Sequence, residues 1–436
     1  MKKVLLVVLA LLLAVPAVSF AGSATSRFDV TIGGFVKFDM GYASQGQGAD
    51  WVFAQRSSNG QQNILDEYDN FFMAAGETRL NFLVKGPDAW GAKTSAFIEG
   101  DFRGAAGTAA SYGLFQLRHA FLKFDWPESS LLIGQTWQSW GLLPCFCLLG
   151  FNELGPFLKG VREPQITFTQ TFMKDFSVAV SIFSPVATLN QVVGSNLTND
   201  YTRVGYPHLS AEFLWKSDAC GKIGPWMLQF GVGGFWGQEK ATYVDGTNTR
   251  GGTISGSSAS VTGTQYATSF EDDMVPSWGA SFKWYIPIIP EKKPGQMGGS
   301  LGFAGVVYQG SNMPRYLGPF GVGSYDQNLS TTGANFVAPM VWGGWGQLFF
   351  YLTDQWSINA QYGIGRYSFS ERYQNANPNA IEKVDHYIMN LIYDVNAAVR
   401  LGVEGTYITT RYAAPANSVK TDGGMWGGRF AAYYFF

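Results

Sequence analysis

Charged side chains are scarce in this 436-residue chain: Asp, Glu, Lys and Arg together make up 14% of the residues, where a soluble domain carries about 25%. Hydrophobic residues nevertheless reach an ordinary 46%. The balance is made up by 54 Gly, 34 Phe, 21 Tyr and 14 Trp, together with many Ser, Thr, Asn and Gln. Aromatic residues bury too much surface for a disordered chain, and Gly, Thr and aromatics are poor helix formers. The composition therefore favours a large β protein.

Other shortages exclude classes of function. Lys and Arg number 30 against 32 Asp and Glu, so no basic excess is present to neutralise the phosphates of a nucleic acid. Three Cys are too few for a disulfide framework. The three His have no spaced partners for metal catalysis, and no Gly-x-Ser-x-Gly elbow is present. We therefore expect neither an enzyme nor a cofactor, with a hydrolase as the enzymatic alternative.

Long apolar runs occur only at the N-terminus. Met1-Lys2-Lys3 precedes an apolar run over 4–18, and Ser19-Phe20-Ala21 fits the small-x-small cleavage pattern. This arrangement predicts a cleaved signal peptide over 1–21, with a membrane anchor as the alternative. No apolar run of 18 residues follows, so we expect the exported chain, 22–436, to be a single domain without a spanning helix.

The strongest pattern in the chain is alternation with a period of two, which is typical of half-buried β-strands. Phe28 to Met40 places apolar residues on one face and mostly polar residues on the other. Its length of about 13 residues exceeds the 9–11 or so that a tilted strand needs to cross a bilayer. For the segment 114–124 the sequence does not decide which residues face inward, because Arg118 and Lys123 fall on opposite faces. The last residues, from Trp426, alternate up to a terminal Phe436. This ending resembles the C-terminal signature of bacterial outer-membrane barrels.

Short and long connections alternate between these segments. The pattern gives 16 strands, seven short turns (including 217–220) and eight long polar loops, with both termini on the short-turn side. Aromatic residues gather near expected strand ends: Trp90, Trp126, Trp137, Trp215, Tyr285, Trp356 and Tyr393. Alternation alone also fits a soluble sandwich. Strand length, turn alternation and aromatic girdles instead predict an all-β fold, a 16-stranded antiparallel transmembrane β-barrel with short periplasmic turns and long external loops.

The first third of the chain resembles the bacterial porin superfamily, and most closely the DcaP-like trimeric porins. The residues that carry the resemblance are 33–39 (GGFVKFD), 78–80 (TRL), 97–102 (FIEGDF), 117–121 (LRHAF) and 132–137 (LIGQTW). The resemblance implies a homotrimer of 16-stranded barrels. It also implies that the loop over about 138–163 folds inward and constricts the pore. That loop is unusually apolar over 142–151, and an apolar narrowing restricts hydrated ions.

Candidate pore-lining charges form two groups. Arg79, Glu99, Asp101 and Arg118 lie on adjacent expected strands, and matching registers would align them as a cross-strand ladder facing the lumen. Such a ladder would either create a transverse field that orients dipolar solutes or stiffen the barrel wall. The charges of the expected constriction loop form the second group: Glu153, Lys159, Arg162 and Glu163.

The loop cysteines, Cys145 and Cys147, fit a metal site, a loop disulfide or two apolar thiols, and the sequence does not decide among these. No second pair of ligands accompanies them, so we expect no bound metal.

These features predict an outer-membrane porin of a Gram-negative-type bacterium. Small hydrophilic solutes or ions would diffuse passively through a water-filled, loop-constricted barrel. The expected surroundings are the lipid bilayer and lipopolysaccharide, with nucleic acid excluded. The alternative is a narrowly conducting or plugged barrel that sheathes a partner or displays surface loops.

Overall fold

The computed structural model describes residues 28–46, 51–56, 68–104, 113–141, 143, 149–150, 156–158, 160–184, 204–244, 270–317, 325–326, 336–376, 380–413 and 422–436. The signal peptide expected over 1–21 lies outside these residues. Within them, no helix combines the length and the hydropathy needed to cross a membrane.

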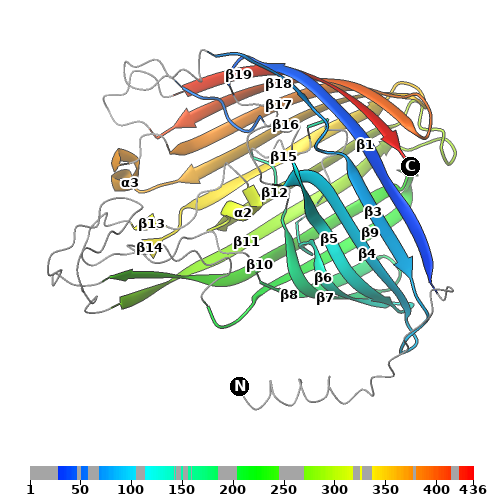
Figure 1. Ribbon diagram of the computed structural model, residues 1–436, viewed down its shortest axis with the longest axis horizontal. Helices are drawn as coiled ribbons and strands as arrows, with labels where there is room; N and C mark the ends of the chain where they lie inside the picture. Colours follow the sequence, from blue (N-terminus) through cyan, green and yellow to red (C-terminus); the bar gives the residue numbers. More distant parts are fainter. Residues whose placement is uncertain are drawn as a thin grey trace.

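One closed sheet of antiparallel strands forms the molecule (Figure 1). Its strands are β1 (Asp29–Ala43), β2 (Asn70–Ala74), β3 (Arg79–Lys85), β4 (Lys93–Gly104), β5 (Leu114–Asp125), β6 (Ser129–Trp137), β7 (Arg162–Phe172), β8 (Phe176–Phe183), β9 (His208–Ile223), β10 (Trp226–Val244), β11 (Phe270–Ile289), β12 (Leu301–Ser311), β15 (Met340–Tyr351), β16 (Trp356–Ser368), β17 (Ile381–Asp394), β18 (Val399–Tyr412) and β19 (Asp422–Phe435). β2 and β3 both pair with β1 and share one position, so the 17-stranded sheet is a barrel of 16 positions. The predicted fold is confirmed.

The seam of the barrel lies between β1 and β19, which pair antiparallel. The backbone groups of Gly34 and Phe436 exchange two hydrogen bonds of 3.2 Å there, so the terminal aromatic residue takes part in closure. A closed barrel leaves no unpaired sheet edge, which a bilayer core without water demands.

Short turns and longer connections alternate around the barrel, as predicted. The seven short turns are 86–92, 126–128, 173–175, 224–225, 290–300, 352–355 and 395–398. The other eight connections leave the opposite end (Figure 1). Two of them contain short elements: α2 (Pro314–Leu317), β13 (Tyr325–Asp326) and β14 (Phe336–Val337) follow β12, and α3 (Glu371–Ala376) follows β16. β1 begins and β19 ends on the short-turn side.

The two faces of the wall differ in the way the alternation predicts. On β1, Val36 is 52% exposed while Lys37 is fully buried. The same contrast recurs on β17, where Tyr387 and Met389 face outward and Ile388 between them is buried. So large an exposed apolar surface indicates contact with a membrane. The soluble-sandwich alternative is wrong, because the strands form one closed layer rather than two stacked sheets.

Aromatic pairs mark both ends of the outer face. Trp356 and Tyr393 stack at 4.3 Å near the short turns. Trp426 contacts Tyr42 at 5.2 Å near the long loops. Such girdles are typical of the two membrane interfaces. The assignment of Tyr285 to a girdle was wrong, because its ring is buried inside the barrel and stacks on Trp226 at 5.7 Å.

One predicted turn was also wrong. Residues 217–220 lie within β9, and the chain reverses at 224–225. The register between β9 and β10 shifts where Leu228 pairs with Ser217 and Met227 pairs with Lys222, so four residues of β9 form a bulge. Gly221 adopts a φ of 76° in this bulge, a conformation that favours glycine. The polar residues Ser217 and Asp218 resemble turn residues, which explains the error.

Candidate functional site: the inside of the barrel

A β-bulge in β5 turns Arg118 into the barrel. The register with β4 shifts between His119 and Leu117, so Arg118 is an extra residue in the ladder. An inserted residue reverses the alternation beyond it, and Leu117 and Leu122 both face outward although five positions separate them. Two consecutive residues, Arg118 and His119, are therefore buried inside. The bulge explains why the sequence of 114–124 shows no single phase.

The predicted cross-strand ladder forms around Arg118. Its guanidinium donates from Nε to Glu99 Oε1 at 2.7 Å and from Nη1 to Asp101 Oδ2 at 2.6 Å. Arg79 lies opposite Asp101 in the register, and its Nη1 is 3.9 Å from Glu99 Oε1. Gln116 donates to Asp101 Oδ1 at 2.5 Å. The structure thus brings together all four residues that the sequence placed on neighbouring strands.

A second network, not predicted from the sequence, continues along the same wall. Lys37 on β1 pairs with Asp39 at 2.9 Å and with Glu77. Arg103 Nη1 lies 2.9 Å from Glu77 Oε1, and Arg429 Nη1 of β19 lies 3.9 Å from Asp39 Oδ1. Both networks consist of largely buried side chains. Buried ion pairs of this kind cost much when one partner is removed, about 3–5 kcal/mol.

A break between β2 and β3 places Glu77 inside the barrel. Residues 75–78 form a turn closed by the amide of Thr78 donating to Ala75 at 3.1 Å. The amide of Lys37 donates to the Thr78 hydroxyl at 3.1 Å instead of to a ladder carbonyl. The alternation of β1 already put Lys37 on the inward face. The inward position of Glu77 could not be predicted in this way, because Glu77 lies outside the regular alternation. We call the nine charges the ion-pair wall: Lys37, Asp39, Glu77, Arg79, Glu99, Asp101, Arg103, Arg118 and Arg429.

The connection after β6 runs inside the barrel, and we call its described residues within 138–161 the inner segment. It first contacts β9, where the Ser139 and Ser210 hydroxyls are 2.9 Å apart. The amide of Gly141 donates to Glu212 Oε2 at 2.7 Å, and Lys283 Nζ donates to the other oxygen of Glu212 at 2.6 Å. One carboxylate thus holds the inner segment to the barrel wall.

A second carboxylate holds the inner segment farther along. The amides of Leu149 and Gly150 donate to the two oxygens of Glu404 on β18, at 2.8 and 3.3 Å. Asn390 also donates to Glu404 at 3.0 Å. The Leu149 carbonyl accepts from Lys37 Nζ at 2.7 Å, which links the inner segment to the ion-pair wall. The inner segment therefore contacts strands on several sides of the barrel.

The returning part of the inner segment packs on β12, β15 and β17. The Pro156 carbonyl accepts from the Tyr308 hydroxyl at 3.0 Å. Phe157 is fully buried, 6.5 Å from the Trp345 ring and 5.4 Å from the His386 ring. Its neighbour Leu158 is equally buried. This end is held by apolar packing rather than by charge.

Residues 51–56, the inner strap, form a second inward contact. Trp51 is fully buried with its ring 4.8 Å from the Arg429 guanidinium. The amide of Ala54 donates to Thr410 Oγ1 of β18 at 2.8 Å. Unlike the inner segment, the inner strap was not predicted from the sequence, because it lies in a loop without apolar periodicity.

Aromatic side chains fill much of the space between the inner segment and the strands from β10 to β15. Trp140 contacts Phe235 at 5.0 Å and Tyr316 at 5.2 Å. Met313, Tyr316 and Leu317, at α2, are buried with them. The interior therefore differs from place to place, with most of the ion pairs near the N-terminal strands and aromatic packing near β10 to β15.

The loop charges predicted from the sequence are only partly described. Glu153 and Lys159 lie outside the described residues. Arg162 begins β7 with its guanidinium 4.8 Å from the Trp137 ring. Glu163 follows it and is fully buried.

Cys145 and Cys147 also lie outside the described residues, whereas Cys220 is a free, exposed thiol in the β9 bulge. Among the residues that the structure does describe, no group of three His, Cys, Asp or Glu is placed to hold a metal ion.

Comparison with known proteins finds matches in structure only. No family model and no curated protein sequence matches the chain. The outer membrane channel DcaP of Acinetobacter baumannii matches with a TM-score of 0.66 at 17% identity, over 95% of this chain and 99% of that one. An anion-selective porin from Comamonas acidovorans gives 0.57 at 11%, over 94% and 100%. The trimer form of OmpT from Vibrio cholerae gives 0.51 at 9%, over 94% and 100%. The chain has the fold of these outer-membrane barrels, which confirms the resemblance at the level of the fold.

Proposed function

We propose that this chain forms a narrow outer-membrane pore through which small hydrophilic solutes or ions diffuse passively. The observation that carries the proposal is the ion-pair wall, whose nine charged side chains face the inside of a closed barrel with an apolar outer face. Most of these charges are buried and neutralise one another. The side chains of Arg79 and Arg103, each 19% exposed, would border the water of the passage. The fold shared with outer-membrane channels supports the same location and role.

The inner segment would narrow this pore. Its amides at Gly141 and Leu149 are held by carboxylates of two different strands, Glu212 and Glu404. The inner segment contacts the ion-pair wall directly at Lys37. Solutes would therefore pass beside the Arg79, Glu99 and Arg118 part of the wall, where cations and anions on neighbouring strands create a transverse field. Five cations and four acids leave the wall with a formal charge of +1, so we expect it to orient dipolar solutes more than to exclude one sign of ion.

A homotrimer is the proposed assembly. β3, β6 and β8 have only seven, nine and eight residues, whereas β10 and β11 have 19 and 20. A tilted strand needs about 9–11 residues to span a bilayer, so the short-strand side is suited to shielding by neighbouring copies. One structural neighbour is a trimer form. Export through a signal peptide over 1–21 would precede this assembly.

A plugged barrel that sheathes a partner or displays loops is the second candidate. The observation in its favour is the buried aromatic packing around Trp140 and Phe157. Planar-bilayer recording of the purified protein separates the two. The pore predicts discrete conductance steps with a measurable reversal potential in a salt gradient. If the folded, inserted protein shows no conductance steps, the proposed pore is wrong and the plugged barrel is supported.

A further inference from the structure

Two glutamines, which we call the amide pair, lie side by side on the inner faces of β15 and β16. Gln347 and Gln361 are paired in register and are 1% and 4% exposed. Within the part of the chain that the structure describes, none of the four polar atoms of these side chains has a hydrogen-bond partner. Asn359, the next inward residue of β16 toward the short turns, has an unpaired Oδ1 as well. Buried amides without partners cost free energy, so this group is suited to a polar molecule that would complete its hydrogen bonds.

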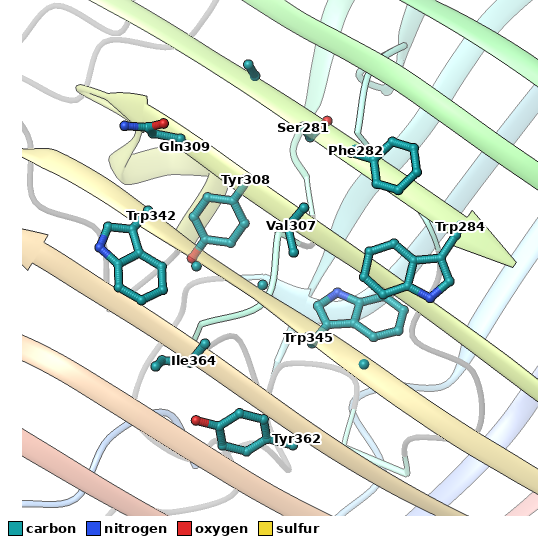
Figure 2. A pocket seen from close by; sticks show the side chains of 14 residues that line it. Ser281, Phe282, Trp284, Val307, Tyr308, Gln309, Trp342, Trp345, Tyr362 and Ile364 are labelled. Atoms are coloured by element: carbon teal, nitrogen blue, oxygen red, sulfur yellow. The ribbon is translucent and has the colours of Figure 1, made fainter.

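The amide pair lies between aromatic rings along β15. Trp345 and Phe349 are the inward residues on either side of Gln347, and both are buried. Trp345 is 3% exposed, whereas Trp342 faces outward on the same strand and is 42% exposed (Figure 2). The indole Nε1 of Trp345 also lacks a hydrogen-bond partner among the described residues. Amides beside the apolar faces of rings suit a solute that carries hydroxyl groups on a ring with apolar C–H faces.

The described strands β12, β15 and β16 are uncharged on their inner faces. β12 and β15 contain no charged residue, and Arg366 of β16 is exposed on the outward side. Glu404 of β18 is linked to this side only through Asn390, which accepts from Asn359 at 2.7 Å and donates to Glu404 at 3.0 Å. A charged solute at the amide pair would lose hydration without meeting an opposite charge. A neutral solute would find both donors and acceptors, because each amide carries both.

Stacked rings lead from the long loops toward the amide pair along β16. Tyr367, an inward residue of this strand, stacks on Phe369 at 5.4 Å, and Phe369 stacks on Tyr373 of α3 at 4.9 Å. Phe369 and Tyr373 are only half-buried. A ring-shaped solute that enters from the loop end would therefore contact aromatic faces before it reaches the amides.

Phe157 of the inner segment lies between the stacked rings and the amide pair. The inward residue of β16 next to Gln361 is Gly363, and a Cβ at this glycine would be 2.6 Å from the Phe157 ring. Phe157 thus occupies the place that a side chain of β16 would otherwise fill. A solute that comes from the loop end has to displace this ring, so the docked inner segment would oppose binding.

We propose that the amide pair and Trp345 bind a neutral sugar inside the barrel. Gln347 and Gln361 would exchange hydrogen bonds with its hydroxyl groups, and the Trp345 ring would contact its apolar face. The proposal rests on the pore proposed above, because the sugar reaches the site through the lumen, and it names the class of solute that this pore would bind. The ion-pair wall takes no part in the site, because its residues lie on other strands.

Isothermal titration of glucose into the full chain, in a detergent without a sugar headgroup, tests the proposal without requiring conduction. The amide variant carries Gln347→Leu and Gln361→Leu. It loses the hydrogen bonds to the sugar, and we expect about tenfold weaker binding or more. The matched control carries Gln229→Leu and Gln309→Leu, a buried glutamine of β10 and an outward one of β12, and should bind as the wild type does.

Two further measurements separate a binding role from a structural one. Because unpaired amides destabilise the folded chain, the amide variant should keep or exceed the melting temperature of the wild type. Glucuronate, which has the same ring with a negative charge, should bind more weakly than glucose. Phe157→Ala should bind glucose more tightly, because no ring has to be displaced, and this result does not depend on the folding of the amide variant.

The outcomes for the site and for the pore are distinguishable. Wild-type protein that binds no glucose, as expected if the amide pair holds water only, would overturn the sugar site even where conductance steps are present. Unchanged glucose affinity in the amide variant would overturn it as well. Glucose binding that the amide variant weakens, in a protein without conductance steps, would support the site and contradict the pore alone.

Discussion

Two sets of polar groups inside the barrel are buried by different means. On the ion-pair wall, charges of opposite sign neutralise one another, as Arg118 does with Glu99 and Asp101. Elsewhere, Glu212 of β9 and Glu404 of β18 accept backbone amides of the inner segment, and Glu404 lies opposite Arg429 of the wall in the register. The difference separates two properties of the pore. The ion-pair wall would set the local field, whereas the two carboxylates would set the width of the passage. Each property is therefore tested by its own variant.

The largest expected effect comes from releasing the inner segment. Glu404→Ala removes the acceptor for the amides of Leu149 and Gly150. Hydrogen bonds to a charged group contribute about 1.5–3 kcal/mol each. The docked position of the inner segment should therefore be destabilised by about 3 kcal/mol or more. We expect larger single-channel conductance steps and greater open-channel noise in planar bilayers. Glu128→Ala, at an exposed turn position, is the control and should conduct as the wild type does.

Altering the ion-pair wall should change ion selectivity more than conductance. Arg118→Gln leaves Glu99 and Asp101 without their main partner. The reversal potential should shift toward cations, and the free energy of unfolding should fall by about 3–5 kcal/mol. Lys123→Gln, near the short turns, removes the same charge from a half-exposed pair and serves as the control. A reversal potential unchanged by Arg118→Gln would show that the ladder only stiffens the wall.

The inner strap should have a smaller influence on transport. Trp51→Ala removes a fully buried ring beside Arg429, at a cost of about 3–5 kcal/mol in stability. The backbone contact of Ala54 with Thr410 remains, so the conductance should rise less than in Glu404→Ala. A rise as large as that of Glu404→Ala would assign the narrowing to the strap. Thermal unfolding and bilayer recording of the same sample give both values.

The smallest effect is expected at the short-turn end of β9. Cys220 is exposed in the β9 bulge, outside the proposed passage. In a Cys145→Ser, Cys147→Ser background, a bulky maleimide should react with Cys220 and leave the conductance unchanged. A block of current by the label would place this position at the pore mouth.

Most of the fold could be predicted from the alternation of polar and apolar residues. Each residue of a strand in a membrane barrel faces either the lipid or the lumen. The alternation placed Arg79 on the strand next to that of Glu99 and Asp101, and the structure pairs Arg79 with Asp101 in register. The prediction from alternation failed where a bulge interrupts the two-residue period. The bulge at Arg118 hides the phase of 114–124, and the bulge at 218–221 resembles a turn.

The contacts of Glu77 and Trp51 could not be predicted from the sequence. Both residues lie in irregular segments between strands, and their partners are distant in the chain. Glu404 was visible only as a polar residue on an inward face. Its role depends on where the inner segment lies, and local pattern does not determine that.

Liposome swelling with neutral sugars of graded size tests the central claim most directly. Reconstituted wild-type protein should admit the smallest sugars at a rate that falls steeply with solute size, because the inner segment narrows a water-filled lumen. Correctly folded protein that admits none of them would contradict the account.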